Sequence, residues 1–171
     1  MICLLVNYSV CIAQDATLIT EIKEQYNKIN AEKKLFKVKA IDDYDASTEG
    51  GRVTAYYKEG MIQLIVADYY GESRKGHSQY YFANGQIVFI VDEISVYNVP
   101  FYIKKDTANG VVNGFDERET KLEIDRYYFH KNKLIKWIDK NNKVVTVNSR
   151  DFQKSEQDQL KEVQRIVKLL K

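Results

Sequence analysis

The chain has 171 residues, 44% of them hydrophobic and 29% charged, which is typical of a folded globular domain and argues against a disordered segment or a membrane bundle. Its 26 basic and 24 acidic side chains leave a net charge of +2, too small to attract nucleic acid or anionic lipid by charge alone. A chain of this length is expected to form one domain with its own hydrophobic core.

Residues 1–13 contain no charged side chain and form a short apolar run that ends directly before Gln14. The run is too short to span a bilayer, and Cys11 and Ala13 are small residues at the positions that a signal peptidase reads before a cut after Ala13. We expect residues 1–13 to be the remnant of a secretory leader without its basic start, and 14–171 to be a single domain. This predicts export to the periplasm or cell envelope. A buried N-terminal strand is the alternative.

Both cysteines, Cys3 and Cys11, lie inside this run. A mature chain that begins near Gln14 would therefore have no disulfide, no thiol nucleophile and no cysteine-ligated zinc. A lipid anchor on Cys11 is a less favoured alternative, because the preceding Tyr8-Ser9-Val10 is a poor lipobox.

Two terminal segments have the spacing of amphipathic helices. Residues 15–34 repeat apolar side chains at three- and four-residue steps, with Asp15 or Thr17 as the cap. The apolar positions are Leu18, Ile22, Tyr26 and Ile29. Residues 151–171 repeat the pattern, with Asn148 or Ser149 as the cap. The apolar positions there are Leu160, Val163, Val167 and Leu170.

The region between these helices is rich in strand-forming residues and contains a repeated hairpin pattern. YYFANGQIVFIVD, from Tyr80, aligns without a gap to YYFHKNKLIKWID, from Tyr127, and a shorter copy, YYKEGMIQLIVAD, starts at Tyr56. The centre of each copy suits a two-residue turn with positive φ. These central pairs are Asn84-Gly85, Lys131-Asn132 and Glu59-Gly60. The pattern predicts an α+β fold around an antiparallel meander sheet of roughly six to eight strands.

A regular ladder beyond Asn84-Gly85 would pair Phe82 with Ile87, Tyr81 with Val88 and Tyr80 with Phe89. One face would then hold Tyr80, Phe82, Ile87, Phe89 and Val91. The second face would hold Tyr81, Val88 and Ile90, and in the later copy Tyr128, Ile135 and Trp137. Because both faces are largely apolar, we expect the two terminal helices to pack on one face and to leave the second partly open and aromatic.

Three segments read as connections between strands. The segment 107–120, TANGVVNGFDERET, combines two Asn-Gly steps with acidic residues and predicts a long mobile loop. IDDYDASTEGGR, from Ile41, predicts a shorter loop, and Pro100 predicts a bend or a sheet edge.

The Tyr-Tyr-x-x-Asn-Gly-x-Leu/Ile hairpin at Tyr80 and Tyr127 resembles the MORN-type repeats and the related repeats of toxin–antitoxin antitoxin components. Most of the chain resembles a group of small exported proteins of Gram-negative bacteria, through its Ala-Gln leader end, the helix EIKEQYNKIN, the two long hairpins and a closing charged helix. That resemblance implies export and the fold but no catalytic residue, since no activity is established for the group. MORN-type repeats are associated with protein or membrane contacts, which favours binding.

Common catalytic and metal-binding patterns are absent or incomplete in the chain. The chain has no GxxxxGK[ST] phosphate loop. Its two histidines, His77 and His130, would need carboxylates such as Asp92 or Asp125 to hold zinc, and a polar position beside a turn is the favoured reading of His130. Ser78, His77 and Asp92 have the residue types of a catalytic triad, but neighbours on a strand point to opposite faces.

Two acidic groups leave alternatives open. One cluster faintly resembles a calcium loop but lacks its closing glutamate, so a solvated turn is favoured. Its members are Asp42, Asp43, Asp45 and Glu49. Glu123 and Asp125 share one face of a predicted strand, where paired carboxylates could serve glycoside hydrolysis, but Lys121 and Arg126 beside them favour a surface charge ladder. We therefore expect no catalytic residue, no metal and no cofactor.

Thirteen tyrosines, many in adjacent pairs, are the remaining feature. Each ring is most often core packing, but tyrosine is also favoured at contact surfaces. The functional hypothesis is an open platform of Tyr57, Tyr81, Tyr128 and Trp137 that binds a protein or a glycan, without nucleic acid and without a transmembrane segment. It predicts a non-catalytic binding or envelope-associated module. The alternatives are an immunity-type inhibitor of a partner enzyme and a carboxylate-dependent hydrolase.

Overall fold

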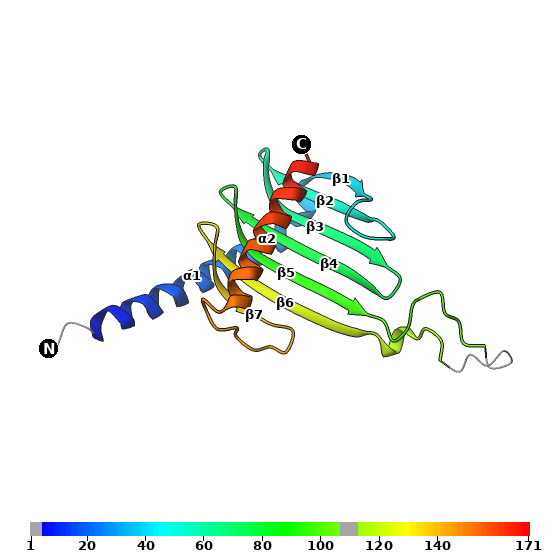
Figure 1. Cartoon of the computed structure of the whole chain (residues 1–171). Helices are drawn as coiled ribbons and strands as arrows, with labels where there is room; N and C mark the ends of the chain where they lie inside the picture. Colours follow the sequence, from blue (N-terminus) through cyan, green and yellow to red (C-terminus); the bar gives the residue numbers. More distant parts are fainter. Residues whose placement is uncertain (1–4, 107–112) are drawn as a thin grey trace.

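The computed structural model describes residues 5–106 and 113–171, with side chains from Ala16 onward. Two helices flank an open antiparallel sheet whose strands follow one another in chain order from β1 to β7 (Figure 1). This confirms the predicted α+β class and meander. The elements are α1 (Leu5–Glu32), η1 (Lys33–Leu35), β1 (Lys37–Asp43), β2 (Gly51–Lys58), β3 (Met61–Gly71), β4 (Arg74–Ala83), β5 (Gln86–Val96), η3 (Glu117–Glu119), β6 (Lys121–His130), β7 (Lys133–Ile138) and α2 (Arg150–Leu169).

The three predicted hairpin turns form as expected. Both central residues of each turn have positive φ: 51° and 74° at Asn84-Gly85, and 50° and 58° at Lys131-Asn132. Glu59-Gly60 has 52° and 79°. These turns match the right-handed twist of the flanking strands, and the Tyr-Tyr repeat is therefore a repeat of hairpins.

A β-bulge follows each of these turns, and the predicted regular register is wrong beyond it. Phe82 pairs with Ile87 as expected, but Tyr81 then pairs with Phe89 and Tyr80 with Ile90. One extra residue on β5 reverses the alternation of side chains along the rest of that strand. The same shift occurs between β2 and β3 and between β6 and β7.

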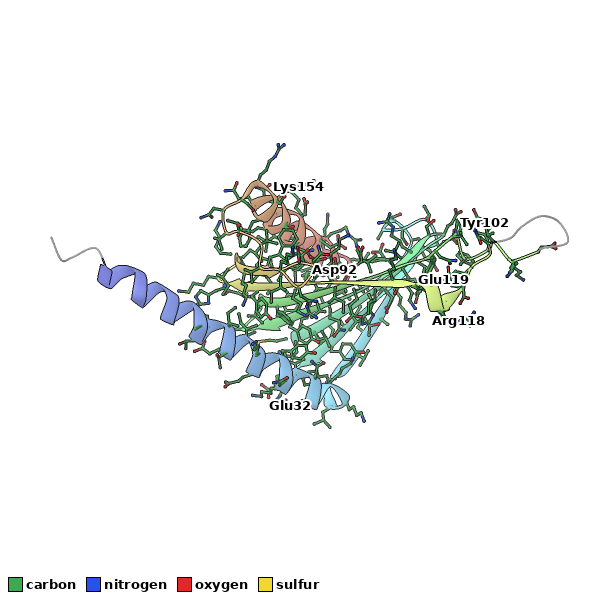
Figure 2. All side chains as sticks on the ribbon, turned by 90° about the horizontal axis from the view of Figure 1, so that it is seen from below. Glu32, Asp92, Tyr102, Arg118, Glu119 and Lys154 are labelled. Carbon is green, nitrogen blue, oxygen red and sulfur yellow. The ribbon has the colours of Figure 1, made fainter. Side chains whose placement is uncertain are left out.

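The two helices cover opposite faces of the sheet, which corrects the prediction that both pack on one face (Figure 2). On the face covered by α2, called the α2 face, Phe152 and Ile166 pack against strand residues such as Tyr80. On the other, the α1 face, Ile22 and Ile29 pack against a set that includes Tyr81. Each face presents a continuous apolar set, so each requires its own cover.

The helix ends agree only partly with prediction. α2 begins after Ser149 as expected, because the Ser149 hydroxyl accepts a hydrogen bond from the Phe152 amide at 3.2 Å. α1 begins at Leu5 rather than near Asp15, and its first part projects beyond the sheet (Figure 1). Among the described residues, neither helix has the length and apolar character needed to cross a membrane.

The connection between β5 and β6 contains the predicted bend at Pro100, whose carbonyl accepts a hydrogen bond from the Ile103 amide at 3.0 Å. Of the loop predicted at 107–120, residues 107–112 lie outside the described residues, and the remainder includes η3. The connection folds back beside the β3–β4 turn, where the Phe101 amide donates to the Glu72 carbonyl at 2.9 Å.

Candidate functional site

α2 covers only part of its face and leaves a groove. The helix runs over the turn ends of the hairpins, where Phe82 and Phe129 belong to the core that it closes. Strands β3, β4 and β5 continue beyond it and form a groove of about 620 Å³ with the β1–β2 loop and the β3–β4 turn. Its lining includes Thr48, Tyr69, Gly71, Gly76, Ser78 and Asp92.

Ser78 and Asp92 form the polar floor of this groove. They are partners in the β4–β5 register and point to the α2 face. The Ser78 hydroxyl donates to Oδ1 of Asp92 at 2.6 Å, and Ser78 itself is only 7% exposed. In the described part of the chain this is the only hydrogen bond that the Asp92 side chain forms, so its other oxygen, Oδ2, has no protein donor.

The pKa of Asp92 is raised above its usual value. Burial is the main cause, since it disfavours the charged form, and the negative charges of Asp125 and Glu162 add to it. Ser78 opposes the shift by hydrogen bonding to the carboxylate. The floor of the groove therefore contains an acid that has no ion-pair partner among residues 5–106 and 113–171.

Asp125 is the direct partner of Asp92 in the β5–β6 register. Trp137 Nε1 donates to Asp125 Oδ1 at 2.7 Å, and the Trp137 ring stacks on Tyr127 with 5.4 Å between the ring centroids. Burial is also the main cause of the raised pKa of Asp125. Two partly buried carboxyl groups thus lie side by side between the groove and the aromatic packing under α2.

Arg165 of α2 contacts Tyr69, one of the groove-lining residues, and has its own acidic partners. It donates to Asp43 Oδ2 at 2.7 Å, to Glu162 Oε1 at 2.8 Å and to the Tyr69 hydroxyl at 2.6 Å. Burial acts to raise the pKa of Asp43, but the hydrogen bond and charge of Arg165 outweigh it and hold that pKa below its usual value. The positive charge of Arg165 is therefore engaged away from Asp92.

Two glycines shape the groove: Gly76 leaves space above β4, and Gly51 makes room for the ring of Tyr69. A Cβ on Gly76 would meet no atom within 4 Å, so the space above β4 is empty at this position. A Cβ on Gly51 would instead clash with the ring of Tyr69, so the glycine lets this ring lie against β2 at the groove wall.

The four residues predicted to form an open aromatic platform do not do so. Tyr81 is 0% exposed and Tyr128 is 5% exposed, both under α1, whereas Tyr57 and Trp137 are partly buried on the α2 face. The bulge on β7 moves Trp137 to the face opposite Tyr128. The shorter repeat copy, which starts at Tyr56, has one residue fewer before its turn. Tyr57 therefore lies on the α2 face, whereas Tyr81 lies on the α1 face. The shared platform is therefore wrong.

The Tyr81 side chain belongs to an aromatic core under α1. Its ring centroid lies 4.9 Å from that of Tyr26, and Phe89 lies 4.7 Å from Tyr128. The Tyr81 hydroxyl donates to Gln79 Oε1 at 2.5 Å and accepts from Asn30 Nδ2 at 3.2 Å. Packing is the role that these contacts indicate for the Tyr-Tyr pairs.

The triad residues are separated as strand alternation requires. His77 Nδ1 lies 2.6 Å from Asp68 Oδ1 on the α1 face, while Ser78 and Asp92 pair on the α2 face. Glu123 and Asp125 do share a face, but Glu123 forms an ion pair with Lys140 at 2.9 Å.

The residues considered as metal ligands are also dispersed. His130 lies at the end of β6, beside its turn. In the acidic segment, Asp42 pairs with Arg52 at 3.2 Å, whereas Asp43 points to Arg165. No group of three or more His, Cys, Asp or Glu side chains suited to a metal ion occurs within 5–106 and 113–171.

The sequence brought Ser78 and Asp92 together only in the disfavoured triad with His77, and it did not indicate a binding site built on this pair. A signal was present, because an aspartate ends the repeat YYFANGQIVFIVD after a run of apolar residues. Its hydroxyl partner is fourteen residues earlier, however, and depends on the bulged register. No family model matches the chain, and neither the curated proteins nor the solved structures compared with it include a match.

Proposed function

We propose that this chain is a non-catalytic binding module that holds a small ligand in the groove on the α2 face. Asp92 is the observation that supports this proposal most strongly. An ionised carboxylate that is partly removed from water costs stability unless it is paired, and the side chain of Asp92 has one neutral hydrogen-bond partner in the described part of the chain. Residues that cost stability in a cleft are typical of functional sites.

The size and lining of the groove support the same proposal. Its volume of about 620 Å³ lies within the range of small-molecule sites, roughly 300–1,000 Å³. Tyr69 and Ile94 supply apolar surface, and Ser78 and Asp92 supply a few polar groups that fix an orientation. The proposal keeps the predicted binding role and transfers it from the buried tyrosines to this groove.

Export is part of the proposal and is supported by the uncharged run at 1–13. Expression of the full chain with a C-terminal tag, followed by cell fractionation and N-terminal sequencing, tests it. The expected result is a periplasmic or envelope protein that starts at Gln14. A cytosolic protein that retains Met1 would contradict export without affecting the groove.

The binding role is tested by ¹H–¹⁵N NMR titration with a mixture of small sugars, amino acids, amines and carboxylates. Gly76→Phe fills the groove, because its side chain enters empty space. Ser95→Phe is the matched control, since Ser95 lies on the neighbouring strand and the opposite face. We expect ligand-induced shifts at groove residues in the wild type and in Ser95→Phe, and none in Gly76→Phe. Shifts that persist in Gly76→Phe would contradict the proposal.

A second candidate, an immunity-type protein that blocks a partner enzyme, is favoured by one observation. Phe101 and Tyr102 are 46% and 55% exposed on the β5–β6 connection, with their ring centroids 5.8 Å apart. Exposed aromatic residues are frequent anchors of protein interfaces. Pull-down from envelope extract should recover a protein that a Phe101→Ser, Tyr102→Ser double variant no longer retains. Equal recovery by both chains would rule out this surface.

A further inference from the structure

We infer that the ligand of the groove carries a positively charged nitrogen, an ammonium or a guanidinium group, which pairs with Asp92. The inference rests on the proposed binding function and names the chemistry of its ligand. Oδ1 of Asp92 accepts from Ser78 at 2.6 Å, which fixes the orientation of the carboxylate. Oδ2 has no donor among the described residues, and it belongs to a residue that lines the groove. An ammonium group supplies both a donor for this oxygen and the missing charge.

The charges around Asp92 select against an anionic ligand. Asp125 faces it from β6, Glu162 approaches from α2, and Glu93 follows it on its own strand. All three are acidic and act on Asp92 in the same direction, against its ionised form. A ligand cation would relieve this repulsion, whereas an anion would add to it.

The nearby cations of the protein do not replace the ligand. Arg165 is bound to Asp43 and Glu162. Arg74 lines the outer end of the groove, four residues before Ser78 on β4, which corresponds to about 13 Å of extended strand. Arg74 therefore lies at the mouth and Asp92 on the floor, so the floor is the place for a ligand cation.

A metal cation fits this floor less well than a nitrogen cation. Calcium takes six to eight oxygen ligands, and magnesium requires near-octahedral oxygen coordination. The groove offers one carboxylate and one hydroxyl at this point, and no group of three candidate metal-binding side chains is found in the described segments. A single carboxylate oxygen without a protein donor can instead accept a charge-assisted hydrogen bond from an organic ammonium group.

The test uses pentylamine and agmatine as cationic probes, with 1-pentanol and pentanoate as neutral and anionic probes of similar length. Binding is followed by ¹H–¹⁵N NMR titration of the full chain at pH 7. We expect only the cationic probes to shift groove resonances. Asp92→Asn should weaken the affinity for these probes at least about tenfold, because one charge-assisted hydrogen bond is lost. Asp42→Asn is the matched control, since Asp42 is exposed and pairs with Arg52 on the other face. It should bind as the wild type does.

Asp92→Asn retains an acceptor for Ser78, and its amide spectrum reports whether it folds. Gly76→Phe keeps Asp92 but fills the groove, so it should no longer bind the cationic probes. If 1-pentanol shifts the groove resonances and the amines do not, the charge inference is overturned while the binding function stands. Equal amine binding by Asp92→Asn would also overturn it. If no probe and no member of the ligand mixture reaches the groove, both proposals fail.

Discussion

Asp92 and Asp125 face one another across β5 and β6 on the same side of the sheet, and neither has an ion pair within the described residues. One is held by the Ser78 hydroxyl and the other by the Trp137 indole. Neutral donors orient a carboxylate without neutralising it, so the pair remains a source of electrostatic cost. This arrangement would be unnecessary in a sheet selected only for stability.

Asp92→Asn is expected to stabilise the protein at neutral pH. Folding raises the pKa of Asp92, so the folded state binds more protons than the unfolded state. The free energy of unfolding therefore falls as the pH rises from the unfolded pKa to the folded pKa. The asparagine variant removes this cost, so its free energy of unfolding at pH 7 should be higher by about 1 kcal/mol. Denaturant unfolding measures this as a higher midpoint concentration. The advantage should disappear near pH 3, where Asp92 is protonated in both states. A less stable variant at pH 7 would show that the charge is compensated.

Removal of Arg165 is expected to destabilise the protein by about 2–3 kcal/mol. Asp43, whose side chain is 2% exposed, loses its ion-pair partner in Arg165→Met. Arg165 itself is 37% exposed, so solvent screening reduces the loss of stability. The double variant Asp43→Asn, Arg165→Met should recover part of the loss. Arg52→Met, which breaks an exposed pair with Asp42, should cost below about 0.5 kcal/mol.

The Asp43 pair also predicts an acid transition. Because folding lowers the pKa of Asp43, its contribution is complete above its unfolded pKa and is lost as the pH falls through the lower folded value. Urea denaturation from pH 7 to pH 2 should show a decline below about pH 4 that is smaller in Asp43→Asn. An identical decline in both chains would assign it to other carboxylates.

The turn at Lys131-Asn132 is a place where substitution should increase the stability of the protein. Both residues have positive φ, a conformation that Gly adopts without cost and Lys adopts poorly. The double change Lys131→Asn, Asn132→Gly copies the Asn84-Gly85 turn and should stabilise the protein by about 0.5–1 kcal/mol in thermal or urea denaturation. The reverse test, Gly85→Ala, should destabilise it by a similar amount. No change in either variant would contradict the shared turn geometry.

Local sequence predicted the turns and the cap of α2 because their chemistry is confined to a few residues. Asn84-Gly85 and Ser149 each carry their own signal. The bulges carry none: the extra residue on β5 is an ordinary Val in an apolar run, yet it moves Phe89 to the other face. Since that shift decides which rings share a face, the platform was predicted wrongly. The common helix face was wrong because each face has its own apolar set and needs its own cover. The groove depends on the same long-range register.

The pKa of Asp92 in the presence and absence of an amine tests the central claim most directly. It can be followed by ¹³C NMR titration of the side-chain carboxyl. Without ligand the pKa should lie above the ordinary value of 3.8, and saturation with pentylamine should lower it, because the bound cation favours the carboxylate. A pKa at or below 3.8 in the free protein, or one that pentylamine leaves unchanged, would contradict a groove built around an unneutralised acid.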